Sequence, residues 1–490
     1  MYIYFTDYFK ISPEALDKYG AFNISLVSDL PLFIDPFLLF NSKKDEYQTL
    51  HEEIINYLKF LKKKSTTMEI DKGALKAWYS FKEVKQNWFG FSIGGNSGSG
   101  LGPGFAKALN ENLSKIFKGF GEEEITKGSH LEKLCLIREG VGKDSISDFA
   151  TNLIKGFLLE YTEEFTKKNV PEELTDEFRV QKAKFNYQTE SWEEGKFVLP
   201  KHQNDFVLLT PKDLLTKDDT WINKTDLIND FDRIPDSVPD EQLRFQINNY
   251  FESQLANEPD EEPTKEETKK AAYSTLQEFP ELIDFFIKYK EANGARAENL
   301  SSQKVKFSQE VYIENVRNFV NKLQRTEFYE LPEENSFIEA KKKIRALKKF
   351  IESNDGYRLF YDNTGKAVKK ESDLQLLFQL ACHDSIFDIN REPNNGRGPV
   401  DFTFSFGKKD KTLVEFKLAS NTQLKRNLLK QVEIYQEAND TEMAFKVIIF
   451  FSEKEHARVK RILMEAELME KQNIILIDGR NDNKPSASKA

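Results

Sequence analysis

The stretch between residues 396 and 420 constrains the fold most, because apolar and polar side chains alternate along two short runs. In the first run, the apolar residues Val400, Phe402, Phe404 and Phe406 alternate with Asp401, Thr403 and Ser405. In the second, Val414, Phe416 and Leu418 share one face, and Leu413, Glu415 and Lys417 share the other. Such alternation is typical of β-strands. The polar, glycine-led segment 407–411 between the runs has the length of a hairpin turn, so the stretch predicts a β-hairpin.

This hairpin would gather charged side chains on one face. Folding it about Lys409 sets Asp401 opposite Lys417 and Thr403 opposite Glu415. Opposed side chains of an antiparallel pair have Cβ atoms about 5 Å apart, and diagonal ones about 7–8 Å. The patch is therefore small enough to hold one divalent ion, and carboxylate oxygens are ligands that Mg²⁺ prefers. We expect burial and a nearby metal to lower the pKa of the lysine, which could then orient or deprotonate a metal-bound water.

The residues that could take part in catalysis follow a definite order along the chain: Glu371, then Pro399-Val400-Asp401, then Glu415-Phe416-Lys417, then Gln431. This order resembles the PD-(D/E)XK nuclease superfamily. The resemblance covers about residues 357–490 and implies an αβββαβ core. It also implies cleavage of nucleic acid, DNA more often than RNA, that depends on Mg²⁺, for which Mn²⁺ can substitute.

The resemblance also implies roles for individual residues. Asp401 and Glu415 would bind the metal, and Lys417 would serve the attacking water. Glu371 would be a further acidic ligand or a water anchor, and Gln431 would enter the site from the helix after the hairpin. A Glu-x-Lys sequence on a strand is, by itself, more often a solvated face than a catalytic site. The surrounding order of elements favours the catalytic interpretation.

Helices are expected on both sides of the hairpin. The segment 371–381 has an apolar helical face, and Glu371 stands at its start. After a capping segment at 420–422, the residues Leu424, Leu428, Gln431 and Tyr435 recur at helical spacing. A glutamine on such a stripe needs a polar partner, which an active site beneath the helix or a backbone group in the core would supply.

Charge is distributed unevenly along the chain, whose net charge is −10. Residues 357–490 contain 22 Lys and Arg against 20 Asp and Glu, while the preceding part carries a net charge of −12. A phosphate-binding surface is therefore expected in the C-terminal part. The candidate nucleic-acid contacts are Arg391, Arg397, Lys425, Arg426 and Lys430. Each of them would contact the backbone rather than read sequence, although a single residue of this kind is more often an ordinary surface charge.

The sequence predicts a mixed α/β, multidomain protein. We expect a mixed α/β recognition or sensor region over 1–250, an acidic linker over 251–270, a helical connector over 271–355 and a nuclease-like domain over 356–490. No apolar run approaches the roughly 18 residues of a membrane span. The N-terminus lacks a signal-peptide layout, and the two cysteines form no disulfide or zinc pattern. We therefore expect a cytoplasmic protein that has no membrane segment.

A glycine-rich loop over 94–104 precedes an expected helix. Glycine loops at helix N-termini can present backbone N–H groups to phosphate. No Lys-Ser or Lys-Thr pair follows, so the loop is not a P-loop, and such a sequence is more often a mobile loop or a tight turn.

Together these features predict a Mg²⁺-dependent endonuclease, with DNA favoured over RNA. A large N-terminal region joined to such a domain is similar to prokaryotic restriction and antiviral defence nucleases, by fold-level analogy. Three alternatives remain: a nucleotide-sensing regulator built on the glycine loop, a catalytically silent nucleic-acid-binding module, and a helical scaffold. A homodimer or a protein partner that binds the N-terminal or helical region is also expected, because cutting two strands needs two sites.

Overall fold

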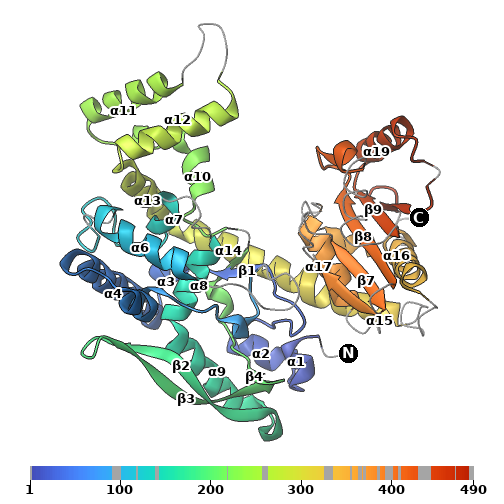
Figure 1. The fold of residues 1–490 in the computed structure, drawn as a ribbon, viewed down its shortest axis with the longest axis horizontal. Helices are drawn as coiled ribbons and strands as arrows, with labels where there is room; N and C mark the ends of the chain where they lie inside the picture. The colour runs from blue at the N-terminus through green and yellow to red at the C-terminus, as the bar shows by residue number, and fades with distance from the viewer. Residues whose placement is uncertain are drawn as a thin grey trace.

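The structure is a computed structural model of the chain. It describes residues 3–90, 101–116, 120–137, 143–217, 219–255, 263–324, 335–353, 356–361, 367, 371–382, 387–391, 401–406, 410–428, 443–469 and 471–484. Two bodies, the N-terminal region (3–255) and the C-terminal unit (335–484), are joined by the connector helices (263–324), as Figure 1 shows. Helices and separate sheets occur in the same chain, so the predicted mixed α/β, multidomain class is confirmed.

The N-terminal region is mainly helical and contains two small sheets. Its strands are β1 (Leu32–Ile34), β2 (Thr175–Asn186), β3 (Ser191–His202), β4 (Asp205–Phe206) and β5 (Leu215–Lys217). Strand β1 pairs with β5, and β2, β3 and β4 form an antiparallel sheet. Its α-helices are α1 (Phe5–Tyr8), α2 (Pro13–Tyr19), α3 (Pro36–Asn41), α4 (Asp45–Thr67), α5 (Lys72–Ala74), α6 (Pro103–Ile116), α7 (Lys133–Ile137), α8 (Lys143–Leu153), α9 (Lys155–Asn169), α10 (Lys224–Asn229) and α11 (Glu241–Gln254).

Helix α4 illustrates why these segments fold as they do. Acidic residues occupy its first turn and Lys64 its last, which suits the helix dipole. Its buried side chains include Leu50, Ile54, Leu58 and Leu61, at the helical spacing that the sequence predicts. The helix therefore buries one stripe in the N-terminal core and leaves the opposite face to solvent.

The connector helices are α12 (Lys265–Glu278), α13 (Leu282–Ala292), α14 (Gly294–Gln309), the π-helical segment η7 (Glu310–Asn315) and α15 (Val316–Leu323). Helices α11 and α12 pack together and project from the rest of the molecule (Figure 1). Helix α14 packs on β5, whereas α15 packs on α17 of the C-terminal unit. The predicted acidic linker is partly helical, because α11 ends at Gln254 and α12 begins at Lys265, and residues 256–262 lie outside the described residues.

The C-terminal unit is a mixed sheet with helices on both faces. Its strands, β6 (Asp388–Arg391), β7 (Phe402–Phe406), β8 (Asp410–Leu418), β9 (Ala444–Phe450) and β10 (Ile474–Asp478), lie in the order β10-β9-β8-β7-β6. Strands β6, β7 and β8 are antiparallel, and β8, β9 and β10 are parallel. Its α-helices are α16 (Ser336–Ser353), α17 (Glu371–Ala381) and α19 (Glu453–Glu465).

Different side chains cover the two faces of this sheet. On one face, the ring of Phe378 in α17 lies 5.1 Å from that of Phe402 and 5.0 Å from that of Phe416. Helix α16 packs on the same face, where Phe337 stacks on Phe445. On the other face, helical residues 424–428 and α19 enclose a separate apolar cluster that includes Leu424, Ile448 and Val459. The predicted alternation of the hairpin therefore separates two cores.

From α17 through β6, β7, β8, helical residues 424–428 and β9, the elements follow the order that the resemblance implies. The nuclease identity of this core stays a prediction. Because α16 packs on β7, β8 and β10, the packed C-terminal unit begins before the boundary expected at residue 356.

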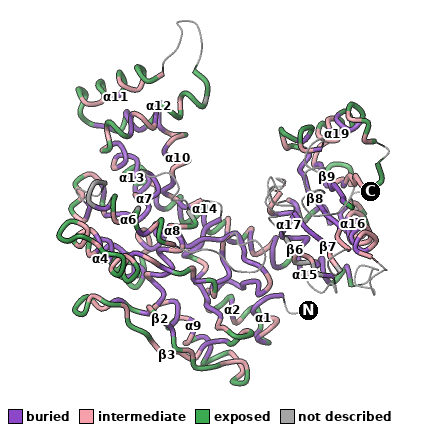
Figure 2. Tube along the Cα trace, viewed as in Figure 1, coloured by how far each residue is buried: buried purple, intermediate pink, exposed green. Residues whose placement is uncertain are grey.

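Buried segments run from the N-terminal region through α17 into β8 and β9, while the outer surfaces of α11 and α12 are exposed (Figure 2). One apolar cluster is continuous from the N-terminal region to the sheet of the C-terminal unit. Within the described chain, no helix combines the length and the apolar character needed to cross a membrane.

Candidate active site

Strands β7 and β8 form the predicted hairpin, but with a different register. Thr403 pairs with Leu413, whereas we predicted that it would lie opposite Glu415. The prediction was wrong because β8 already begins at Asp410, which shortens the expected 407–411 turn. The Asp410 carboxylate accepts hydrogen bonds from Ser336 N (2.8 Å) and Ser336 Oγ (2.6 Å), a contact with α16 that no local pattern reveals. Since the shift is an even number of residues, each side chain keeps its predicted face.

The predicted charged residues meet at the end of β8. Asp401 Oδ2 accepts a hydrogen bond from Phe416 N at 2.5 Å. Lys417 Nζ lies 3.3 Å from Glu415 Oε1 and 3.2 Å from Glu371 Oε2. Asp401, Glu415 and Lys417 are 7%, 6% and 8% exposed, so the charges interact away from bulk solvent. The structure thus brings together four of the five predicted catalytic residues.

Glu371 reaches this cluster from the first residue of α17. Its Oε1 accepts hydrogen bonds from Leu418 N at 3.1 Å and from Asn421 Nδ2 at 3.0 Å. Its Oε2 accepts one from Lys417 Nζ. Glu371 therefore fixes the carboxyl end of β8 and orients Lys417. Asn421, which the sequence analysis did not identify, is a further member of the site.

Burial raises the pKa of Asp401 to about 7; Lys417 opposes this effect, and Glu415 and Glu371 add to it. Burial lowers the pKa of Lys417, but the carboxylates of Asp401, Glu415 and Glu371 together raise it by more, so the pKa lies above its ordinary value. The predicted lowering of the lysine pKa assumed a nearby metal and stays a prediction for the metal-bound site. In the metal-free site, Lys417 is an ammonium that partly neutralises three carboxylates.

The donor set suits a hard divalent cation. Asp401 and Glu415 supply carboxylate oxygens, and the Thr403 Oγ1 atom beside them is buried without a hydrogen-bond partner in the described structure. Among the described residues, no group of three His, Cys, Asp or Glu side chains is arranged to hold a metal. At this site the Lys417 ammonium lies between Glu371 and Glu415. Asp401 and Glu415 with water ligands are thus the pair that would hold Mg²⁺.

Lys446 is a second buried lysine that the sequence analysis missed. It lies directly opposite Glu415 on β9 and is 5% exposed. Its Nζ donates hydrogen bonds to Asn427 O and Leu428 O, both at 2.8 Å. Burial lowers its pKa to about 8, against the opposing effect of Glu415. The signal in the sequence was a single lysine within the apolar run 444–450.

The other predicted site residues are either exposed or lie partly or wholly outside the described residues. Lys425 is exposed and forms an ion pair with Glu465 at 2.6 Å, and Arg426 is also exposed. Arg391 ends β6, but its side chain lies outside the described residues. Gln431, Lys430, Arg397, Pro399 and most of the glycine loop 94–104 also lie outside them.

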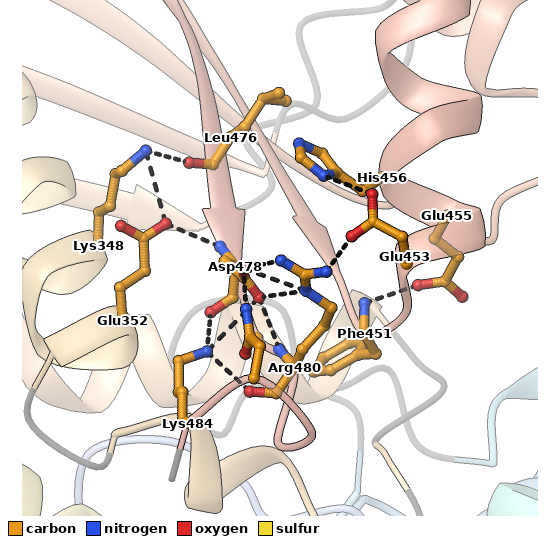
Figure 3. Close-up of polar contacts among 12 residues, drawn as sticks. Lys348, Glu352, Phe451, Glu453, Glu455, His456, Leu476, Asp478, Arg480 and Lys484 are labelled. Atoms are coloured by element: carbon orange, nitrogen blue, oxygen red, sulfur yellow. Dashed lines mark hydrogen bonds and ion pairs between the residues drawn. The ribbon is translucent and has the colours of Figure 1, made fainter.

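A second polar cluster braces the exposed edge of the sheet at the end of β10 (Figure 3). Lys348 of α16 donates to Leu476 O at 2.6 Å, and Glu352 accepts a hydrogen bond from Asp478 N at 2.8 Å. Asp478 also accepts hydrogen bonds from Arg480 and Lys484. A cavity of about 460 Å³ lies beside these groups. Their cations are matched by Asp478 and Glu453, which makes the cluster a structural brace.

Two family models match separate parts of the chain. Residues 10–223 match a family described as Domain of unknown function (DUF8370). Residues 336–453, which include the whole candidate site, match one described as Domain of unknown function (DUF8371). No curated protein and no solved structure matches the chain.

Proposed function

We propose that the C-terminal unit is a metal-dependent nuclease that hydrolyses phosphodiester bonds, with DNA as the favoured substrate over RNA. The observation that carries the proposal is the convergence of Asp401, Glu415, Lys417 and Glu371 at the end of one buried strand. Ionisable side chains are rarely buried together in a core, and such clusters occur mostly at functional sites. The resemblance supports the same assignment.

The side chains divide the work according to their contacts. Asp401 and Glu415 would hold the divalent cation, which supplies a more acidic bound water and neutralises charge on the phosphate. Lys417 donates hydrogen bonds and remains protonated in the metal-free site, so it is suited to orient a water or a phosphate oxygen. Glu371 limits the positions that the Lys417 ammonium can adopt. Asn421 in turn helps to hold Glu371.

The test measures cleavage of supercoiled DNA, linear DNA, single-stranded DNA and RNA with Mg²⁺ or Mn²⁺. We expect Asp401→Ala and Lys417→Ala to lose cleavage by about a hundredfold or more. Lys196→Ala is the matched control, because Lys196 forms an exposed pair with Glu177 in the N-terminal region. Asp401→Asn, which keeps the size of the side chain, separates loss of charge from loss of folding. Cleavage by both alanine variants at the wild-type rate would contradict the assignment.

The cellular role is a further part of the proposal. A role in restriction or antiviral defence, exerted with a protein partner or as a homodimer, rests on the analogy of a large N-terminal region joined to a nuclease-like unit. Infection of cells that express the wild type or Asp401→Ala would test this role.

A further inference from the structure

A buried polar contact joins the N-terminal region to the helix that carries Glu371. Lys217, the last residue of β5, lies with its Nζ 3.5 Å from Asp373 Oδ2 and 3.0 Å from Tyr312 OH. Tyr312, in the π-helical segment η7, donates its hydroxyl hydrogen to Asp373 Oδ1. The side chains of Lys217 and Asp373 are 6% and 9% exposed, so this ion pair is removed from solvent.

The three residues come from the three parts of the chain. Lys217 belongs to the segment that matches one family and Asp373 to the segment that matches the other. Tyr312 lies in the connector helices, between the two matches, and is fully buried. Its backbone oxygen accepts a hydrogen bond from Tyr4 OH, which ties the same turn to the N-terminus. The Lys217 ammonium also lies 4.6 Å from the centre of the Phe307 ring, so the connector encloses it.

Asp373 connects this contact to the candidate active site, because it lies on the same helical turn as Glu371. Asp373 is two residues after Glu371, in the first turn of α17. Along the helix axis, Asp373 and Glu371 are thus about 3 Å apart, and a shift of this turn moves both residues. A second hydrogen bond, from Ser28 Oγ to Gln379 Oε1 at 3.3 Å, holds the far end of α17 to the N-terminal region.

The residue types in this contact argue that it does more than stabilise the packing of the two regions. Replacing a buried ion pair by apolar side chains is often neutral or stabilising, so a charged contact is a weak way to gain stability. A charged contact of this kind does, however, form only when its three side chains adopt one particular geometry. A π-helical turn, such as the one that carries Tyr312, is a rare local structure that occurs frequently at functional sites.

We propose that Lys217, Tyr312 and Asp373 form a latch through which the N-terminal region sets the position of Glu371 and thereby the activity of the nuclease site. The proposal rests on the proposed nuclease function and adds its control. The latch residues are positioning residues, because none of them touches Asp401, Glu415 or Lys417 in the described contacts. A ligand or partner that rearranges the N-terminal region around β5 would act on the site by this route.

The central test is Tyr312→Phe, which removes one hydroxyl and keeps the ring. We expect kcat for cleavage to fall about tenfold or more with KM unchanged, because a displaced Glu371 no longer orients Lys417. Tyr361→Phe is the matched control, since Tyr361 donates its hydroxyl hydrogen to Gly479 O at 2.9 Å within the C-terminal unit, away from α17. Equal kcat losses in the two variants would overturn the latch.

A second measurement does not depend on activity. Hydrogen exchange at Leu418 N reports the bond to Glu371 Oε1 directly. Tyr312→Phe and Lys217→Met should exchange this amide about tenfold faster than wild type, while the amides of β9 stay unchanged. Unchanged exchange at Leu418 in both variants would refute the latch even if nuclease activity is established. Faster exchange in a protein that cleaves no nucleic acid would support the latch and reject the proposed function.

Discussion

The N-terminal region and the C-terminal unit both bury acidic side chains, but they neutralise them in different ways. In the C-terminal unit, the Lys417 ammonium lies within 3.3 Å of both Glu415 and Glu371. In the N-terminal region, Glu132 is fully buried, and neither of its carboxylate oxygens has a hydrogen-bond partner in the described structure. The ring of His130 lies beside it, with Nδ1 4.0 Å from Glu132 Oε2.

Burial favours the protonated form of the carboxyl groups in this N-terminal cluster, and of Glu132 above all. Burial raises the pKa of Glu132 to about 8, and Asp35 raises it further. Burial also raises the pKa of Asp35 to about 6, although hydrogen bonds from Trp221 N and Phe37 N oppose the effect. The other ring nitrogen of His130, Nε2, lies 2.9 Å from Glu291 Oε1 and forms a hydrogen bond with it.

The difference shows what a buried acidic cluster needs in order to bind a cation. In the C-terminal cluster, burial raises the pKa of Asp401 only to about 7 and the Lys417 ammonium favours its ionised form, so a divalent ion can compete for the oxygens near neutral pH. A cluster that holds protons must lose them first, at a cost of about 1.4 kcal/mol for each pKa unit above the working pH. The C-terminal cluster is therefore the better candidate for metal chemistry.

The largest effect is expected when the ammonium is removed. Lys417→Met leaves Asp401, Glu415 and Glu371 without their cation, and an uncompensated buried charge costs about 3–5 kcal/mol. We expect the free energy of unfolding, measured with urea near pH 8, to fall by about this amount. Lys425→Met removes an exposed lysine from the same unit and should leave the urea midpoint unchanged. A Lys417→Met variant as stable as wild type would show that the carboxylates are already protonated.

The next effect concerns pH and the N-terminal cluster. Glu132 titrates near 4.5 when unfolded and near 8 when folded, so between these values the folded state retains a proton that the unfolded state has lost. Stability then falls as pH rises, by about 1.4 kcal/mol per pH unit, or about 3 kcal/mol from about pH 5.5 to about pH 7.5. Glu132→Gln should remove this part of the slope and be more stable than wild type at the upper end.

Urea unfolding across the same pH range measures this slope. Glu173→Gln, a change at an exposed glutamate of the same region, is the matched control and should leave the slope as in wild type. A slope that is identical in wild type and Glu132→Gln would mean that the Glu132 carboxyl is ionised in the fold, and the two clusters would then not differ in this respect.

The two clusters also differ in how far the sequence could predict them. Glu415 and Lys417 lie on β8, and Asp401 directly precedes β7. The alternation of this hairpin survives any even shift in register, so their common face was predictable although the register was not. Glu371 was predictable from its place at the start of a helix. By contrast, Asp35 and Glu132 come from distant segments and meet only through tertiary packing, and Glu291 joins them through His130, which no local pattern records.

The register of the hairpin and the pKa of Lys417 also depend on contacts between residues that are distant in the sequence. The turn of the hairpin was misjudged because Asp410 is drawn into β8 by Ser336, about seventy residues earlier in the chain. The raised pKa of Lys417 in the metal-free site was not predictable either, because the combined field of three carboxylates exceeds the effect of burial, and that balance depends on distances that a sequence does not contain.

A smaller effect is expected for Lys446, the second buried lysine of the C-terminal unit. Lys446→Met loses two hydrogen bonds to backbone oxygens, but it also removes an ammonium whose lowered pKa shows that burial disfavours its charge. These contributions oppose each other, so the free energy of unfolding near pH 7 should change by about 1 kcal/mol or less. A loss as large as that of Lys417→Met would show that Lys446, opposite Glu415, shares in neutralising the carboxylates.

The smallest effects on stability are expected for exposed ion pairs. They test whether the difference between the two regions depends on burial or on the presence of ion pairs alone. Each region has an exposed pair: Lys196 with Glu177 at 2.8 Å, and Lys425 with Glu465 at 2.6 Å. Water and salt screen such pairs, so Glu177→Gln and Glu465→Gln should both leave the urea midpoint unchanged, at low and at high salt. If Glu465→Gln alone shifts the midpoint at low salt, the field of the acidic site extends to the surface, and part of the effect ascribed to burial at Lys417 belongs to that wider field.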